Sequence, residues 1–358
     1  MKCVSLFSGC GGLDLGLVRA GFKVVLANDN EKKCEDSHTI NFPKTKFYLG
    51  SVKDLTSEKL TELLGKDLRK IDLVAGGPPC PPFSKSRFYR KDKPRALDDP
   101  VGFETVSGYF DVVSKLNPKA FLLENVPGFA YKTHSEVLDY VLGEIEKLGY
   151  EYNYETINAA NFGIPQTRER FILVGTKKSK FKFPEATHLK PSEKLDLFEK
   201  SKPCWVPVKE AIGDLDTDEN ASDEGHFAGG QYHDLLKEIP PGDNYLYFTE
   251  KRGHPNPKFK WRSRYWSYLL KLSPDRPSWT IQARRSNNMG PFHWRNRILR
   301  IEEVKRIQTF PDSWVLKGTT EQQWRQVGNA VPPLLAEIIG REVKKHINKT
   351  AKENRKKK

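Results

Sequence analysis

The chain has 358 residues and a formal net charge of +14, with 37% hydrophobic and 11% aromatic residues. This length suffices for one large domain and a smaller one. No stretch approaches the ~18–20 apolar residues of a membrane-spanning helix, and the first residues turn into glycines too early for a signal peptide. The five cysteines are scattered without a CxxC pair, which argues against a disulfide framework or a metal site and favours a reducing, cytoplasmic setting.

Strand-like and helix-like segments alternate in the first half of the chain. Strands are predicted for Lys2–Phe7, Lys23–Asp29, Ile71–Ala75, Ala120–Asn125 and Glu169–Thr176. Helices are predicted for Leu13–Gly21, for residues 31–42 and for Ser135–Gly149. The alternation indicates an α/β fold with a parallel, doubly wound sheet and helices on both faces.

The composition changes after about residue 178, which indicates a second, smaller domain. Between Lys251 and Arg300 there are thirteen lysines and arginines, one acid (Asp275) and eight aromatic residues. Basic groups interleaved with aromatics suit a polyanion whose bases also need contact; the alternative is a solvated charged face with a few core aromatics. We expect domains at 1–180 and 181–296, a hinge and C-terminal helix at 297–350, and a disordered basic tail at 351–358.

A glycine-rich turn, FSGCGGLDLG (residues 7–16), separates the first strand from the first helix. Open α/β sheets bind ligands at this point, and glycines let the backbone approach them. Because Asp14 stands where a GxGxxG motif requires glycine, a nicotinamide cofactor is disfavoured. Asp29 ends the second strand, where a carboxylate accepts ribose hydroxyls. The combination suits S-adenosylmethionine, with a tight structural turn as the alternative.

Cys80 lies in GGPPCPPF, directly after the predicted strand Ile71–Ala75. Proline fixes φ and restricts the residue before it, so Pro78 and Pro79 predict a rigid loop at the carboxyl end of the sheet. A buried structural cysteine, the alternative, does not need such a loop. A nucleophile does, because reacting atoms must be held close and aligned.

Polar residues also follow the next strands. Glu124 and Asn125 end the apolar run AFLL, and a strand-end carboxylate is a candidate site residue, with a helix cap as the alternative. Arg168 and Arg170 in QTRER alternate along an extended segment, so we expect both on one face. Arginine there could hold Glu124 and an electronegative atom of the substrate.

Taken together, these motifs resemble those of the DNA (cytosine-5) methyltransferases found in bacterial restriction–modification systems. The matching stretches occur in the order FSGCGGLDLG, ANDNEK, DLVAGGPPCPPFS, ENV, QTRER, VPVKEAIGDL, PSWTIQARR, RILRIEEVKRIQTFPD and QVGNAVPPLLAEIIG. The resemblance covers essentially the whole chain. It implies a Rossmann-like S-adenosylmethionine-dependent methyltransferase sheet with a second, DNA-recognition domain.

The resemblance also implies the catalytic roles. Cys80 attacks C6 of a cytosine flipped out of duplex DNA. Glu124 hydrogen-bonds the N3/N4 edge of the base, and Arg168 orients Glu124, with Arg170 beside them. The methyl group then passes from S-adenosylmethionine to C5, and loss of the C5 proton and of Cys80 frees 5-methylcytosine.

Further residues are implied for the cofactor and for DNA. The cofactor positions are Phe7, Ser8, Gly9, Gly11, Gly12, Leu13, Asp29, Asn30, Ser51, Val52, Pro79, Asn329 and Ala330. The DNA-contacting positions are Ser84, Arg262, Arg264, Thr280, Arg284 and Arg285; arginine is the commonest bidentate reader of guanine, and phosphate binding is its alternative role. We expect a monomer whose functional partner is a cognate restriction endonuclease, acting in the bacterial cytoplasm on the nucleoid.

The sequence departs from the family pattern at three positions. Pro81 replaces the usual Gln after the nucleophile, Ser51 replaces an Asp that binds the adenine, and Val101 replaces a common Arg. Nucleophile, acid and arginine remain, so activity is expected. The alternatives are a tRNA-methylating relative, whose CFT tripeptide is not found in the sequence, and a catalytically dead DNA-binding homologue, which tends to lose the cysteine or glutamate.

Overall fold

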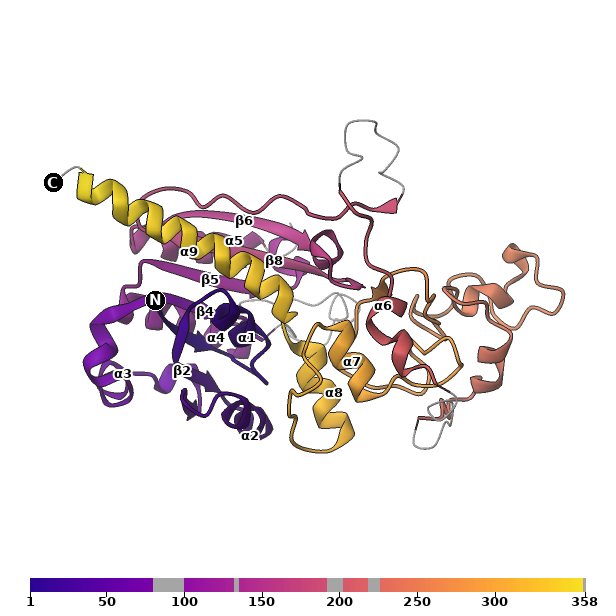
Figure 1. Ribbon diagram of the computed structural model, residues 1–358. Helices are drawn as coiled ribbons and strands as arrows, with labels where there is room; N and C mark the ends of the chain where they lie inside the picture. Colours follow the sequence, from indigo (N-terminus) through magenta and orange to yellow (C-terminus); the bar gives the residue numbers. More distant parts are fainter. Residues whose placement is uncertain (80–99, 132–134, 192–201, 218–225, 357–358) are drawn as a thin grey trace.

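A twisted sheet of seven strands forms the centre of the computed structural model, which describes residues 1–79, 100–131, 135–191, 202–217 and 226–356 (Figure 1). The strand order is β3-β2-β1-β4-β5-β8-β6. The strands are β1 (Lys2–Leu6), β2 (Lys23–Asp29), β3 (Lys46–Leu49), β4 (Ile71–Gly76), β5 (Ala120–Asn125), β6 (Glu151–Asn158) and β8 (Glu169–Thr176). This arrangement confirms the predicted Rossmann-like class.

Helices cover both faces of the sheet. The α-helices are α1 (Gly12–Arg19), α2 (Lys32–Asn41), α3 (Ser57–Leu64), α4 (Pro100–Leu116), α5 (Ser135–Lys147), α6 (Lys209–Ile212), α7 (Ile301–Ile307), α8 (Thr320–Asn329) and α9 (Pro333–Lys356). Short 3-10 helices are η1 (Val52–Asp54), η2 (Gly65–Lys70), η6 (Pro127–Ala130), η8 (Ala159–Phe162), η10 (Gly213–Leu215), η11 (His233–Lys237), η12 (Tyr245–Phe248) and η13 (Glu250–Arg252).

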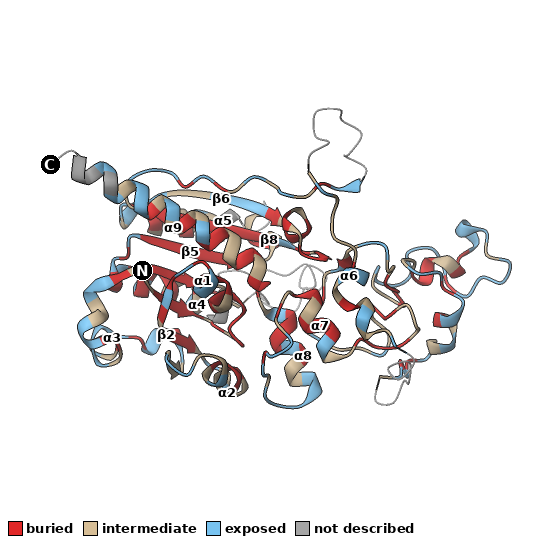
Figure 2. Ribbon diagram, viewed as in Figure 1, coloured by how far each residue is buried: buried red, intermediate tan, exposed pale blue. Residues whose placement is uncertain are grey.

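Alternating side chains along the strands supply two separate hydrophobic cores. On β4, Val74 faces the core shared with α3, α4 and α5, whereas Leu73 and Ala75 face the core shared with α1 and α9. Successive residues of a strand point to opposite faces, so a continuous apolar strand is needed wherever both faces are covered. Figure 2 shows the central strands β5 and β8 as buried, whereas the edge strand β6 is largely exposed.

The prediction of a wholly parallel sheet is wrong at β8. This strand runs antiparallel to both of its neighbours, β5 and β6. Between β6 and β8 the chain has only η8 and the two-residue strand β7 (Gln166–Thr167). That connection contains no crossover helix, and a parallel neighbour would need one.

Helix α9 differs from the prediction at its C-terminal end. It was expected to cover Pro332–Ile347 and to be followed by a disordered tail, but it continues to Lys356. Its buried residues Leu335, Ile339 and Val343 pack in the same core as Leu17 of α1. Gly16 permits this contact, because a Cβ there would lie 2.4 Å from the Pro333 carbonyl oxygen.

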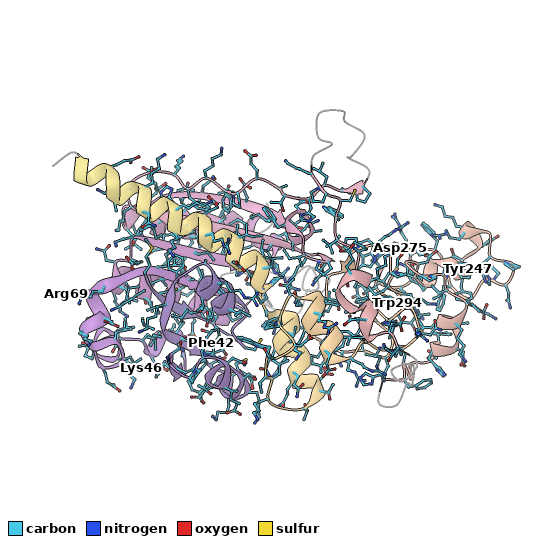
Figure 3. The ribbon with its side chains drawn as sticks, in the orientation of Figure 1. Phe42, Lys46, Arg69, Tyr247, Asp275 and Trp294 are labelled. Carbon is cyan, nitrogen blue, oxygen red and sulfur yellow. The ribbon has the colours of Figure 1, made fainter. Side chains whose placement is uncertain are left out.

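The second region has a core of its own, to which α7 and α8 contribute. Phe248, Phe292, Val304 and Trp324 belong to this core, and Figure 3 shows its side chains around Trp294. A two-stranded sheet joins it to the first region, because β9 (Ser278–Trp279) pairs in parallel with β7. No helix among the described residues is long and apolar enough to cross a membrane.

Candidate active site and DNA interface

The glycine turn before α1 lies against the carboxylate of Asp29. The Gly9 amide donates to Asp29 Oδ2 at 2.9 Å, and the Glu31 amide donates to Oδ1 at 3.0 Å. Gly11 has φ +90, and a Cβ there would lie 2.6 Å from the Phe42 ring. Only glycine fits a left-handed position so close to an aromatic ring.

The described residues leave space beside the same turn. Apart from the chain neighbours of Gly9, no atom of the described residues lies within 4 Å of the place where a Cβ on Gly9 would stand. Burial raises the pKa of the Asp29 carboxyl, while the backbone amides of Glu31, Gly9 and Asn30 oppose that rise. A half-buried carboxylate next to open backbone fits a group with hydroxyl donors, such as a ribose.

Ser51 and Val52 follow β3, which lies next to β2. The amide of Gly50 donates to the Asp29 carbonyl at 3.0 Å, and Asn28 Nδ2 donates to the Gly50 carbonyl at 2.9 Å. These bonds bring the predicted cofactor residues Asp29 and Ser51 to the same edge of the sheet. Ser51 Oγ accepts from the Lys53 amide at 3.2 Å and caps η1.

Asp14 is a buried residue with a structural role that the sequence did not predict. It is fully buried and accepts from the Ser5 hydroxyl, and its Oδ2 lies 2.6 Å from His38 Nε2. The carboxylate therefore ties together β1, α1 and α2. Asp14, which disfavours a nicotinamide cofactor, thus helps to fix the glycine turn in place.

Glu124 is the last residue but one of β5 and is almost completely buried. Its exposed fraction is 5%, and a Cβ on Gly77 would lie 2.6 Å from its Oε2. Burial raises the pKa of the Glu124 carboxyl, and the charges of Arg170 and Arg168 oppose that rise. Arg170 makes the ion pair, with Nε 2.8 Å from Oε1 of Glu124.

Arg168 lies on the same buried face as Arg170, because both are buried and Glu169 between them is exposed, as strand alternation predicts. Its guanidinium donates to the backbone carbonyls of Ile281 (3.1 Å), Gly328 (2.8 Å) and Ala330 (3.0 Å). The ion pair with Glu124 belongs to Arg170, and the charge of Arg168 also acts on this carboxyl group.

The start of the nucleophile loop is fixed to the same strand end. Asn125 Nδ2 donates to the Pro78 carbonyl at 3.2 Å, and Asn125 is fully buried. Cys80, Pro81 and Ser84 lie outside the described residues, which stop at Pro79 and resume at Pro100. Of Val101 only the helical backbone in α4 is described.

The second region is fastened to the arginine motif by the Thr-Ile pair. Thr280 Oγ1 donates to the Thr167 carbonyl at 2.8 Å, and the Ile281 amide donates to Gln166 Oε1 at 3.0 Å. The hydroxyl predicted to contact DNA is therefore engaged with the backbone of β7. Asn329, at the end of α8, is exposed, and the neighbouring Ala330 supplies a carbonyl to Arg168.

Exposed aromatic rings gather on the second region. Tyr265, Trp266 and Trp279 are exposed by 66%, 51% and 42%, and the rings of Trp266 and Trp279 meet edge-on with centroids 5.7 Å apart. Tryptophan rarely stays this exposed in a soluble protein, and clustered apolar surface marks an interaction site. The sequence shows that this region is rich in aromatic residues, but it does not show which of these rings are exposed and which are buried in the core.

Exposed basic side chains lie in the same part of the chain as these rings. Arg262, Arg264 and Arg284 are exposed, and Lys251 Nζ lies 4.6 Å from the centre of the Trp261 ring. Asp275, the one acid between residues 251 and 300, pairs with Lys209, Nζ to Oδ1 2.6 Å (Figure 3). Acids outside this range pair with Arg252 and Arg295, namely Asp243 and Asp216, so the positive charge of the range is compensated in part.

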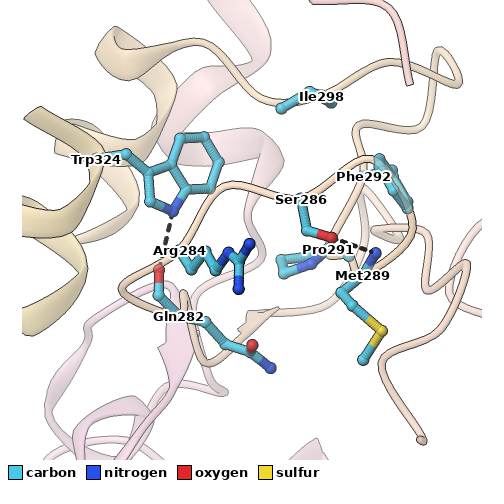
Figure 4. Close-up of a pocket in the computed structure, with 9 residues that line it drawn as sticks. Gln282, Arg284, Ser286, Met289, Pro291, Phe292, Ile298 and Trp324 are labelled. Carbon is cyan, nitrogen blue, oxygen red and sulfur yellow. Dashed lines mark hydrogen bonds between the residues drawn. The ribbon is translucent and has the colours of Figure 1, made fainter. Parts of the chain in front are cut away.

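A small cleft lies where the second region meets α8 (Figure 4). Trp324 closes one side of it and donates from Nε1 to the Gln282 carbonyl at 2.8 Å. The predicted DNA-contacting Arg284 also lines it. The other lining residues are Ser286, Met289, Gly290, Pro291, Phe292 and Ile298. Within the described part of the chain, no group of three or more His, Cys, Asp or Glu is placed to hold a metal ion.

The family follows from comparison with known proteins. The profile of the C-5 cytosine-specific DNA methylases matches residues 1–345. The chain belongs to this family. The resemblance read from the motifs is thereby confirmed, and the protein is a DNA cytosine-5 methyltransferase.

Relatives and solved structures agree with the assignment. Type II methyltransferase M.SacI of Streptomyces achromogenes is 38% identical, over 95% of this chain and 92% of its own length. M.MthTI of Methanothermobacter thermautotrophicus is 31% identical, over 97% and 98%. A DNA modification methyltransferase encoded within an E. coli prophage matches with a TM-score of 0.67 and 25% identity, over 97% and 99%. Dnmt2 of S. pombe, 16% identical over 97% of this chain and 99% of its own with a TM-score of 0.64, shares the fold.

Proposed function

We propose that this methyltransferase uses Cys80 as nucleophile and Glu124, held by Arg170, as the acid that receives the flipped cytosine. The observation that carries the proposal is the buried Glu124–Arg170 pair at the end of β5. This pair lies beside Gly77 and Pro78: a Cβ on Gly77 would lie 2.6 Å from Glu124 Oε2, and the neighbouring Asn125 donates to the Pro78 carbonyl. The peptide that carries the thiol thus leaves the sheet beside the carboxyl group.

The methyl donor of the proposal is S-adenosylmethionine, which supplies an electrophilic methyl group when bound. Asp29 and the backbone of the glycine turn fit its ribose. Two amides fix the carboxylate, and the described residues leave space beside Gly9, whose amide is one of the two donors. Ser51 and Val52 lie at the adjacent strand end, where we place the adenine. The serine hydroxyl replaces a carboxylate there and can still accept one hydrogen bond.

Glu124 can donate a proton to N3 of cytosine because burial favours its neutral form. A carboxyl group with a raised pKa keeps its proton to higher pH than an exposed glutamate. Arg170 limits this effect and fixes the orientation of the group. Protonation at N3 draws electrons from the ring, so that addition of a thiolate at C6 becomes easier and C5 becomes nucleophilic.

The exposed rings and arginines of residues 251–300 form the proposed DNA-reading surface. Indoles can stack on bases, and arginine can bind guanine or phosphate. The hydrogen bond from Thr280 to the Thr167 carbonyl attaches this surface to β7. A role beside a restriction endonuclease is proposed from the Type II relatives, with a monomer that acts in the cytoplasm on nucleoid DNA.

The decisive experiment measures the transfer of labelled methyl groups from S-adenosylmethionine to unmethylated duplex DNA and to tRNA. We expect label in DNA only, and none with Cys80→Ser, which should still bind DNA. Duplex DNA with 5-fluorocytosine should trap a covalent adduct on Cys80, because fluorine cannot leave as a cation. Label in tRNA alone would point to the tRNA-methylating relative, and label in neither would point to a regulatory homologue.

A further inference from the structure

Two rows of basic side chains lie side by side at the end of the molecule opposite the second region. One row is on α9, where Arg341, Lys345 and Lys349 recur every four residues and are exposed. The other is the segment after β8, where Lys178, Lys180 and Lys182 are exposed. In Figure 1 this segment runs past the C-terminal half of α9, far from α6 and the second region.

Direct contacts hold the two rows together. Ser179 Oγ lies 3.3 Å from His346 Nε2, and the rings of Phe181 and His346 meet edge-on with centroids 6.0 Å apart. Phe181 and Phe183 are buried in the core under α9. Because side chains alternate along an extended segment, burying these two phenylalanines turns Lys180 and Lys182 outward.

The spacing of the charges suits a phosphate backbone. Residues four apart on a helix are separated by about 6 Å along its axis, and residues two apart on an extended segment by about 6.7 Å. Duplex DNA carries one phosphate for about every 1.7 Å of its axis when both strands are counted. A row of three cations therefore extends over several phosphates of a duplex that lies along it.

The ion pairs that two of these cations make on α9 are exposed to solvent. Arg341 pairs with Glu337 and Lys345 with Glu342 on the same helix. The side chains of Arg341 and Lys345 remain 60% and 71% exposed, and exposed pairs of this kind contribute little. Lys177 differs from its neighbours, because its Nζ lies 3.8 Å from the centre of the Tyr150 ring and points inward.

We propose that the surface formed by Lys178, Lys180, Lys182, Arg341, Lys345 and Lys349 binds the phosphate backbone of duplex DNA outside the target site. α9 begins beside Ala330, which contacts Arg168, and Lys345 lies about 18 Å further along the helix. The surface is therefore separate from the reading surface and independent of sequence. It holds a DNA flank or a second duplex, and raises the local DNA concentration during the search for a site.

The test compares salt dependence of binding in matched variants. The first carries Lys180→Gln, Lys182→Gln, Lys345→Gln and Lys349→Gln. The control carries Lys23→Gln, Lys44→Gln, Lys66→Gln and Lys70→Gln, which remove the same charge from exposed positions elsewhere on the first region. Each is titrated with a 40-base-pair duplex of random sequence and with tRNA at several KCl concentrations, and each is assayed for methyl transfer to saturating unmethylated genomic DNA.

We expect the first variant alone to bind the duplex about 10- to 100-fold more weakly at low salt. The slope of log K against log salt should fall in magnitude by about 2–4, at roughly 0.9 for each lost phosphate contact. Turnover on saturating DNA should stay that of the wild type, so that failure here is distinct from failure of the catalytic proposal. Equal slopes for both variants, or a loss confined to tRNA, would overturn the inference.

A local readout excludes an indirect effect of the substitutions. Burial lowers the pKa of His346, and the charge of Lys349 lowers it further. Phosphates bound at the two rows should raise the pKa of this imidazole, because a nearby anion favours its charged form. An NMR titration of the wild-type protein with the same duplex should show that rise, and an unchanged His346 pKa would contradict binding at this place.

Discussion

Nε of Arg170 lies 2.8 Å from Oε1 of Glu124, at the meeting of the antiparallel strands β8 and β5. Because both side chains are nearly buried, removing the guanidinium leaves the carboxyl group without its closest opposing charge. Arg170→Ala should therefore raise the pKa of Glu124 further and lower the methyl-transfer rate by about 10²–10³-fold. Steady-state kinetics with Arg69→Ala, an exposed arginine on η2 (Figure 3), as control measure the effect.

The pH profile gives the same pair a second test. A carboxyl group whose pKa is raised is protonated at low pH and loses its proton as the pH rises through that pKa. A step that needs protonated Glu124 should therefore slow toward high pH in the wild type, and the decline should move to higher pH in Arg170→Ala. Glu124→Gln should lose this limb; a limb that persists in Glu124→Gln belongs to another group.

Arg168 should affect stability more than chemistry. Its guanidinium satisfies the carbonyls of Ile281, Gly328 and Ala330, which come from the second region and from the end of α8. Arg168→Ala leaves these acceptors without their donor, so we expect a loss on the order of 3 kcal/mol in the free energy of unfolding. Urea denaturation measures it. Wild-type stability together with abolished turnover would show that Arg168 acts at the reacting base instead.

The contrast between these two arginines shows what the sequence could predict. The strands Lys23–Asp29, Ala120–Asn125 and Glu169–Thr176 were predicted with their observed bounds, because each is a continuous apolar run with a polar end. Strand alternation then placed Arg168 and Arg170 on one face, and both are buried there with Glu169 exposed between them. The sequence carries no local signal for their different partners, because the carbonyls that Arg168 binds belong to Ile281, Gly328 and Ala330, more than a hundred residues away.

The missed end of α9 and the exposed tryptophans are features that local composition did not predict. The polar end of α9 was predicted to be a disordered tail because its composition is basic, whereas the helix continues to Lys356. The contacts of His346 with Ser179 and Phe181 hold the helix just before this extension, inside the predicted range. The exposure of Trp266 and Trp279 depends on which side chains of an irregular region pack into the core. Such a region has no regular alternation of buried and exposed residues, so its pattern of hydrophobic residues does not predict which rings stay exposed.

Gly77 provides a test of the space around Glu124. A Cβ at this position would lie 2.6 Å from Glu124 Oε2. Gly77→Ala should therefore displace the carboxyl group and lower turnover at least about 10-fold, since small misplacements of reacting groups are costly. Gly143→Ala on α5, where nothing lies within 4 Å, is the matched control and should leave activity unchanged. Equal activity of the two variants would mean that Glu124 adapts without loss.

Asp29 should determine affinity for the cofactor. Two backbone amides donate to its carboxylate, so Asp29→Asn turns an amide group toward a donor as well as losing the charge. We expect S-adenosylmethionine to bind about 10- to 100-fold more weakly, measured by isothermal titration calorimetry. Asp36→Asn, which removes a partly exposed carboxylate from α2 that pairs with Lys32, serves as control. Unchanged affinity in Asp29→Asn would place the ribose elsewhere.

Trp279 should contribute to DNA binding through its exposed ring. It lies on β9, one residue before Thr280, and meets Trp266 edge-on at 5.7 Å. Loss of base stacking by an indole costs about 1–3 kcal/mol, so Trp279→Ala should weaken duplex binding by about 5- to 150-fold while S-adenosylmethionine affinity stays constant. Phe227→Ala removes another aromatic of the second region, exposed by 55%, and should have a smaller effect. Fluorescence anisotropy of labelled duplex DNA measures both, and equal losses would show that general packing, not the indole pair, supports the interface.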